Sequence, residues 1–140
     1  MFQIALNIRR RTPAVDRRRL RRAVRAILGE AAIGEALVSV AVVDDGTIRE
    51  LNRRYLGHDE ATDVLSFVLE ETGDRLEGEI VVSADTAAET APRFGWSAED
   101  ELLLYVIHGM LHLVGYDDTT PRKRAMMRKR ERKYLSQSGG

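Results

Sequence analysis

The chain begins with alternating apolar and polar positions, which predict a short β-strand. Phe2, Ile4, Leu6 and Ile8 occupy every second position, and a period of two places these side chains on one face of a sheet. The spacing then becomes helical, with apolar residues at Leu20, Val24, Ile27 and Leu28. Thr12 and Pro13 supply an N-cap and a first-turn proline, so a helix is expected over about residues 13–28.

A second strand and a second helix are predicted next. The β-branched run at residues 36–43 ends at Asp44-Asp45-Gly46, which is typical of a strand entering a turn. Thr47 and Glu50 have the spacing of a capping box. The helix that they begin is expected to turn three apolar side chains inward: Ile48, Leu51 and Tyr55.

The second half of the chain predicts a hairpin followed by three helices. Residues 64–69 and 80–83 are short apolar runs separated by a connection with two glycines, which favours an antiparallel hairpin. Residues 84–92 favour a helix. Ser97 and Asp100 cap a further helix, which is apolar on nearly every side over residues 102–114 and is therefore expected at the centre of the fold. Thr120-Pro121 begins a last helix, rich in Lys and Arg, that runs to about Leu135.

These elements define an α+β fold. We expect a single domain over residues 1–140, with a mixed four-stranded sheet packed with about five helices in the order βαβαββααα. A length of 140 residues suits one core. No apolar run reaches the roughly 20 residues of a membrane span, no secretory signal is visible at the amino terminus, and there is no cysteine. We therefore expect a cytoplasmic protein without a membrane partner.

The net charge of zero hides two basic segments. Residues 9–25 contain nine Arg and one acid, Asp16, and residues 121–133 contain eight Lys or Arg and one acid, Glu131. Clustered basic residues are typical of proteins that bind polyanions. They are also typical of the solvated faces of surface helices, so charge alone leaves both interpretations open.

The predicted central helix carries a candidate metal site. His108 and His112 are four residues apart, so on a helix their imidazoles share one face and can bind the same ion. Gly115 can end the helix and let the chain fold back, which supplies a carboxylate from Asp118 or Asp117 as a third ligand. Two His, one carboxylate and an open position form a catalytic zinc arrangement. The alternative is a pair of hydrogen-bonded core histidines. A zinc protease is disfavoured, because Gly109 stands where an H-E-x-x-H protease has its Glu.

Two segments resemble the YbeY family of endoribonucleases, the rRNA maturation factors. Residues 108–117, with the sequence HGMLHLVGYD, are similar to the family pattern H-G-x-L-H-L-x-G-Y-D-H. Residues 51–67 resemble its L-N-x-x-Y-R-x-x-D-x-x-T-[DN]-V-L-S-F segment. The resemblance covers about residues 36–135. It implies a metal-dependent endoribonuclease, with one Zn²⁺ per chain, that cleaves single-stranded RNA in 16S rRNA 3′-end maturation and ribosome quality control. Its expected partners are rRNA and a ribosomal subunit or ribosomal protein, with no DNA.

Three positions depart from the family pattern. The third metal-binding His of the family falls at Asp118, its Arg at Leu56, and its Pro at Val68. The resemblance favours Asp118 over Asp117 as third ligand, and a carboxylate ligand predicts a weaker Lewis acid because it lowers the positive charge of the site. Leu56 cannot bind a phosphate by charge, so we expect RNA to be held by the Arg-rich amino-terminal helix and by Arg53 and Arg54.

The sequence leaves the roles of several residues open. Arg53 and Arg54 are alternatively solvated surface residues, and the same holds for the loop residue His58. Ser66 lies either near the site or on an exposed strand face, and no residue is identifiable as the general base. Two rival functions also stay open. One is a non-catalytic ribosome-assembly factor that retains a structural metal, and the other is a metal-dependent hydrolase of a small substrate.

Overall fold

A mixed sheet of order β1-β2-β4-β3 forms the base of the molecule. In the computed structural model, which describes residues 1–12 and 14–138, β1 (Phe2–Ile8), β2 (Glu35–Val43) and β4 (Arg75–Ser83) run parallel. The fourth strand, β3 (Val64–Thr72), pairs with β4 as an antiparallel hairpin. The predicted fold class, the mixed sheet and the order of the elements are therefore confirmed.

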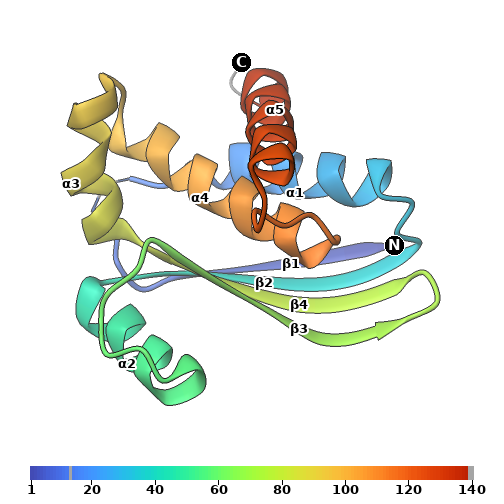
Figure 1. The fold of residues 1–140 in the computed structure, drawn as a ribbon, viewed down its shortest axis with the longest axis horizontal. Helices are drawn as coiled ribbons and strands as arrows, with labels where there is room; N and C mark the ends of the chain where they lie inside the picture. Colours follow the sequence, from blue (N-terminus) through green and yellow to red (C-terminus); the bar gives the residue numbers. More distant parts are fainter. Residues whose placement is uncertain (13, 139–140) are drawn as a thin grey trace.

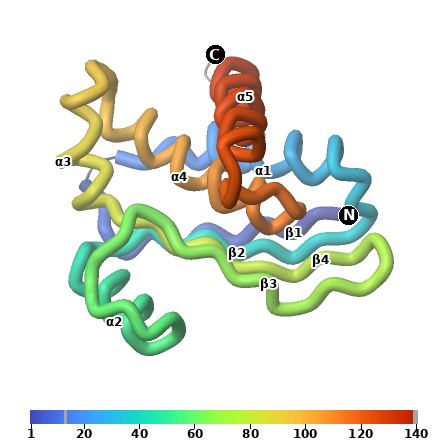
Figure 2. Tube along the Cα trace, in the orientation of Figure 1, coloured from blue at the N-terminus to red at the C-terminus, as the bar shows by residue number. Residues whose placement is uncertain are grey.

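Five helices occur within the described residues. They are α1 (Arg17–Glu30), α2 (Asp45–Leu56), α3 (Ala84–Phe94), α4 (Ala98–Leu113) and α5 (Pro121–Ser138). Figure 1 shows α1, α3, α4 and α5 on one face of the sheet and α2 alone on the other. The tube in Figure 2 shows α5 standing over α4 and α1, and α5 contacts both helices. In the part of the chain that the structure describes, no helix is both long and apolar enough to cross a membrane.

The main core lies between the sheet and the helices α1 and α4. Burial alternates along β2, so Val38, Val40 and Val42 face the helical layer and are almost fully buried. From α1, Ile27 and Leu28 pack into the same core. Each fully buried aliphatic side chain of this size contributes about 1.5–3 kcal/mol. The α4 helix is buried on most sides, as its apolar sequence predicts.

The first helix is shorter at its start than the sequence predicts. Asp16, and not Thr12, is the N-cap, and its carboxylate accepts a hydrogen bond from the backbone N–H of Arg19 at 3.1 Å. Aspartate caps helices better than threonine does, so the later residue determines the start. Pro13 lies outside the described residues. The helix also passes Gly29 and ends at Glu30.

Two predictions about α2 and one about the hairpin were wrong. The N-cap of α2 is Asp44, which accepts from the N–H of Thr47 at 2.7 Å, so Thr47 lies within the first turn. Tyr55 is not buried: it is 62% exposed, and its ring packs edge-on with Phe67 on β3 at a centroid distance of 5.9 Å, because α2 covers only part of its sheet face (Figure 1). In the hairpin, residues 70–79 mostly extend the two strands, and the turn is only Gly73-Asp74.

Candidate metal centre and cleft

The α4 helix brings His108 and His112 together at its carboxyl-terminal end. Ser97 caps the helix as predicted, accepting from the N–H of Asp100. Between the two histidines, Gly109 lies against the sheet, and a Cβ there would be 3.0 Å from Ile80 and 3.2 Å from Val64. The missing side chain lets α4 approach the sheet closely, and the two histidines that flank it in the helix are only partly buried.

The two imidazoles converge with a carboxylate from the loop after α4. The Nε2 atoms of His108 and His112 are 3.1 Å apart, close to the ~3.3 Å between two nitrogen ligands of a tetrahedral zinc ion with bonds of 2.0–2.1 Å. One ligand atom from each of His108, His112 and Asp118 lies within 4.8 Å of the other two. Three converging donors of these types could hold one divalent ion.

Glu131 on α5 orients His108. Its carboxylate lies 3.1 Å from His108 Nδ1 and is only 14% exposed. A carboxylate on one ring nitrogen of a metal-binding histidine fixes the ring and directs the other nitrogen toward the ion. The hydrogen bond to Glu131 raises the pKa of His108, although burial opposes the shift. His108 therefore retains a proton to higher pH without an ion, and a bound ion would displace that proton.

The loop after α4 separates the roles of its two aspartates. Gly115 adopts φ +107°, a backbone conformation that favours glycine, and turns the chain back as predicted. Asp117 accepts hydrogen bonds from the N–H and hydroxyl of Thr119, and Lys123 lies 3.3 Å from its other oxygen. Asp118 is exposed and belongs to the group with the histidines. This geometry favours Asp118 over Asp117 as the third donor.

An open cleft of about 570 Å³ lies beside the histidines. Its walls are residues 61–64 at the start of β3, Thr86 and Thr90 of α3, and the facing sides of α4 and α5. His108 and Glu131 line it directly, so the candidate metal centre opens into this cleft. A substrate in the cleft would therefore approach the three donors from the side of His108.

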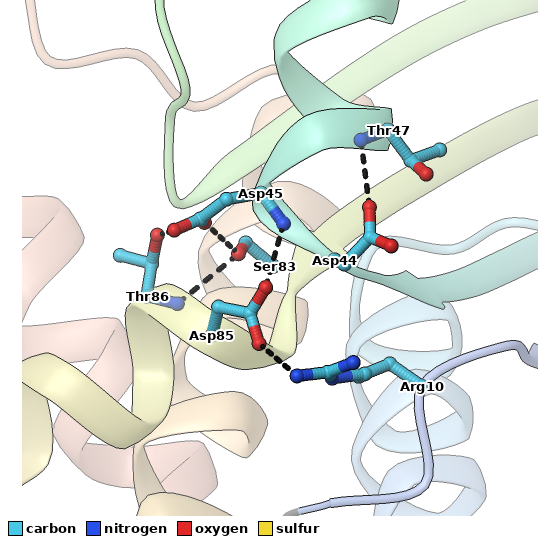
Figure 3. A network of polar contacts seen from close by, with 7 residues as sticks. All are labelled: Arg10, Asp44, Asp45, Thr47, Ser83, Asp85 and Thr86. Carbon is cyan, nitrogen blue, oxygen red and sulfur yellow. Dashed lines mark hydrogen bonds and ion pairs between the residues drawn. The ribbon is translucent and has the colours of Figure 1, made fainter.

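A polar network fixes one end of the cleft (Figure 3). Ser83 and Thr86 both donate hydrogen bonds to the carboxylate of Asp45 at the start of α2, and Asp85 accepts from the backbone N–H of Asp45 at 2.9 Å. Arg10 pairs with the other oxygen of Asp85 at 3.1 Å. The starts of α2 and α3 are thereby joined to the segment after β1, and Thr86 holds the network against the cleft wall.

The structure does not bring the other candidate residues to the cleft lining. Arg53 and Arg54 lie on α2, on the opposite face of the sheet from α4 (Figure 1), and both pair with Glu50. Leu56, on the same helix, is 51% exposed. His58 is exposed in the loop after α2, and Ser66 is half-buried on β3. These five residues are absent from the lining of the cleft.

The sequence interpretation missed Glu131 as a site residue. It noted Glu131 only as the single acid among eight basic residues of the last helix. That isolation was the signal available in the sequence, since a single carboxylate on an otherwise basic helix can indicate a specific contact. Its partner could not be predicted, because the contact with His108 depends on how α5 crosses α4.

An α+β fold with two histidines and a carboxylate converging beside an open cleft defines a candidate metal-dependent hydrolase. A family model described as Endoribonuclease YbeY matches residues 5–139. The Endoribonuclease YbeY of Salinibacter ruber is 47% identical over 107 residues, covering 71% of this chain and 68% of the relative. That of Moorella thermoacetica is 43% identical over 125 residues, covering 81% and 80%.

A solved structure supports the same assignment. The solution structure of a Thermotoga maritima protein superposes with a TM-score of 0.67 at 33% identity, covering 99% of this chain and 89% of that one. The chain described here belongs to the YbeY family of endoribonucleases.

Proposed function

We propose that this protein is a metal-dependent endoribonuclease that hydrolyses single-stranded RNA. The observation that carries the proposal is the group of His108, His112 and Asp118, whose ligand atoms lie within 4.8 Å of one another beside an open cleft. Zinc suits this set of nitrogen and oxygen donors and the open fourth position. When bound, such an ion would either lower the pKa of a bound water toward ~7 or polarise a phosphoryl oxygen.

The protein's own residues prepare the site for this chemistry. Glu131 holds His108 by its Nδ1 and so fixes the direction of Nε2. Gly115 returns the chain so that Asp118 reaches the same point. Gly109 lets α4 lie close against the sheet, and His108 on the same helix lines the cleft. The donors are thereby fixed before an ion or a substrate arrives, which lowers the cost of ordering them.

The cellular role that we propose is 16S rRNA 3′-end maturation and ribosome quality control in the cytoplasm. The support is the family resemblance and the basic surface, since α5 exposes many Lys and Arg side chains. Such residues bind RNA phosphates without reading sequence. A ribosomal subunit or ribosomal protein would then bring the enzyme to its cleavage site.

A non-catalytic assembly factor is the second candidate function. The observation that favours it is Leu56, which stands where the family has an arginine and cannot bind a phosphate by charge. However, Leu56 does not line the cleft. The substitution therefore removes no group from the walls around His108, and we retain the catalytic proposal.

An RNA cleavage assay tests the proposal and separates the two candidates. Purified protein should cleave single-stranded RNA, and a chelator should abolish the cleavage until zinc is restored. The variants His108→Ala and His112→Ala should both be inactive, whereas His58→Ala should cleave normally because His58 is exposed outside the cleft. If the wild type binds metal and RNA but cleaves nothing, the assembly-factor function is correct and the proposal of catalysis is wrong.

A further inference from the structure

The cleft beside His108 continues into a second groove between α4 and α5. This second hollow, of about 350 Å³, shares Phe94, Glu101, Leu104 and Glu131 with the cleft. Its own lining adds Trp96, Arg128, Arg132 and Leu135. We call it the α5 groove. A strand of polymer that passes His108 can therefore continue along α5 without leaving the surface.

The walls of the α5 groove combine an exposed aromatic ring with cationic side chains. Phe94, at the last position of α3, is 69% exposed, which is unusual for a ring of this size. Arg128 and Arg132 are four residues apart on α5, so they project from one face of the helix. Neither guanidinium forms an ion pair with any carboxylate of residues 1–12 or 14–138. Both charges are available to a ligand.

The two acids of the α5 groove are already satisfied within the protein. Glu101 is 3% exposed and accepts a hydrogen bond from Trp96 Nε1 at 2.7 Å. Glu131 is bound to His108. Their negative charge is directed into the protein, whereas the two arginines are exposed. The groove therefore presents positive charge and an aromatic surface together.

The row of arginines extends toward the candidate metal centre. Arg124, one turn before Arg128, donates to the backbone carbonyl of Asp118 at 3.2 Å. From Arg124 to Arg132 the helix rises by ~12 Å. The row thus begins at the loop that supplies the third donor and runs along the groove away from it.

We propose that the α5 groove binds the single-stranded RNA next to the scissile phosphate. One base stacks on Phe94, and the backbone phosphates contact Arg128 and Arg132. This assignment rests on the proposed function and adds the site that holds its substrate. Aromatic stacking with cationic contacts suits single-stranded nucleic acid of any sequence, because every base has a π-face. It also gives the preference for single strands a structural reason, since paired bases cannot stack on a protein ring.

RNA binding by matched variants tests the α5 groove. The affinity for a labelled oligouridine is measured by fluorescence anisotropy in chelator, so that no cleavage occurs, at several salt concentrations. The double variant Arg128→Ala/Arg132→Ala should bind at least about 10-fold more weakly. The slope of log affinity against log salt should also become less negative by about 1.4, because two phosphate contacts are lost. Phe94→Ala should bind about 5- to 150-fold more weakly with the slope unchanged, and Phe94→Tyr should restore binding.

The control is a second double variant on the same helix, Arg122→Ala/Lys129→Ala. It removes the same charge from exposed positions outside both hollows, and should change the affinity much less. If the two double variants weaken binding equally, the α5 groove is not the RNA site, whether or not the wild type cleaves RNA. The α5 groove is also not the RNA site if neither double variant weakens RNA binding, a result expected if the groove binds a protein partner instead. If groove variants lose RNA binding while the wild type cleaves nothing, this inference stands and the proposed catalysis fails.

Discussion

The two basic helices of this protein differ in what they do for the fold. The α1 helix has a sharply divided surface, and five of its residues are buried in the core: Leu20, Ala23, Val24, Ile27 and Leu28. The α5 helix buries only three described residues and crosses over α4 and α1. Its Glu131 contacts His108, and its arginines line a groove. The α1 residues line neither hollow.

A run of arginines therefore does not by itself locate a binding surface. On α1 the arginines mostly occupy the solvent side of a helix whose other side builds the core. On α5 the low apolar content leaves a helix held by few side chains, and its position above α4 brings charged groups to the site. We therefore infer that α1 mainly stabilises the fold, whereas α5 supports the metal centre and contacts the substrate.

The largest expected effect is on stability, from truncation of the buried face of α1. Ile27 is 1% exposed in the main core, so Ile27→Ala should lower the free energy of unfolding by about 2–5 kcal/mol. Urea denaturation measures the loss. Zinc affinity of the folded variant should not change. A loss below about 1 kcal/mol would contradict the assignment of α1 to the core.

The next effect concerns metal binding and the single acid of α5. Glu131→Gln removes the carboxylate that orients His108, and zinc affinity should fall about 10- to 100-fold. The matched control is Glu30→Gln, which removes the α1 carboxylate that contacts Lys133 and Tyr134 of α5 at 2.7 Å. Competition with a metal indicator measures both affinities. Equal affinities for the two variants would refute the positioning role of Glu131.

A smaller, pH-dependent effect is expected where α1 meets α4. Arg19 lies 2.9 Å from Asp100, and its hydrogen bond lowers the pKa of that carboxyl below the usual 3.8. A lowered pKa gives stability that is complete above the ordinary value and disappears as the pH falls through the lower, folded value. Asp100→Asn should therefore lose up to about 1 kcal/mol above pH ~5 and nothing below pH ~2. Urea unfolding across this range checks the sign, and a loss that grows on acidification would contradict it.

The smallest effect should come from the solvent side of α1. Arg18 and Arg22 are exposed, and Arg18→Ala/Arg22→Ala should change the free energy of unfolding by no more than about 0.5 kcal/mol. Oligouridine affinity should fall far less than in Arg128→Ala/Arg132→Ala. If this variant loses as much oligouridine affinity as Arg128→Ala/Arg132→Ala, both basic helices bind RNA and the difference proposed between α1 and α5 is wrong.

Most features of this protein that depend on local sequence patterns were predicted from the sequence, whereas several features that depend on long-range contacts were not. The convergence of His108 with His112 follows from helical spacing, and the return of the chain at Gly115 follows from its backbone freedom. The contact of Glu131 with His108 spans 23 residues and requires the docking of α5 on α4, which no local pattern encodes. The exposure of Tyr55 likewise depends on how little of its sheet face α2 covers.

The central claim is that one ion held by His108, His112 and Asp118 is required for RNA cleavage. The most direct measurement adds zinc stepwise to chelator-treated protein and records bound zinc and cleavage of single-stranded RNA in the same samples. We expect that both rise together and level off at about one ion per chain, and that neither rises in His112→Ala. Full cleavage before zinc is added, or unchanged zinc binding by His112→Ala, would contradict it.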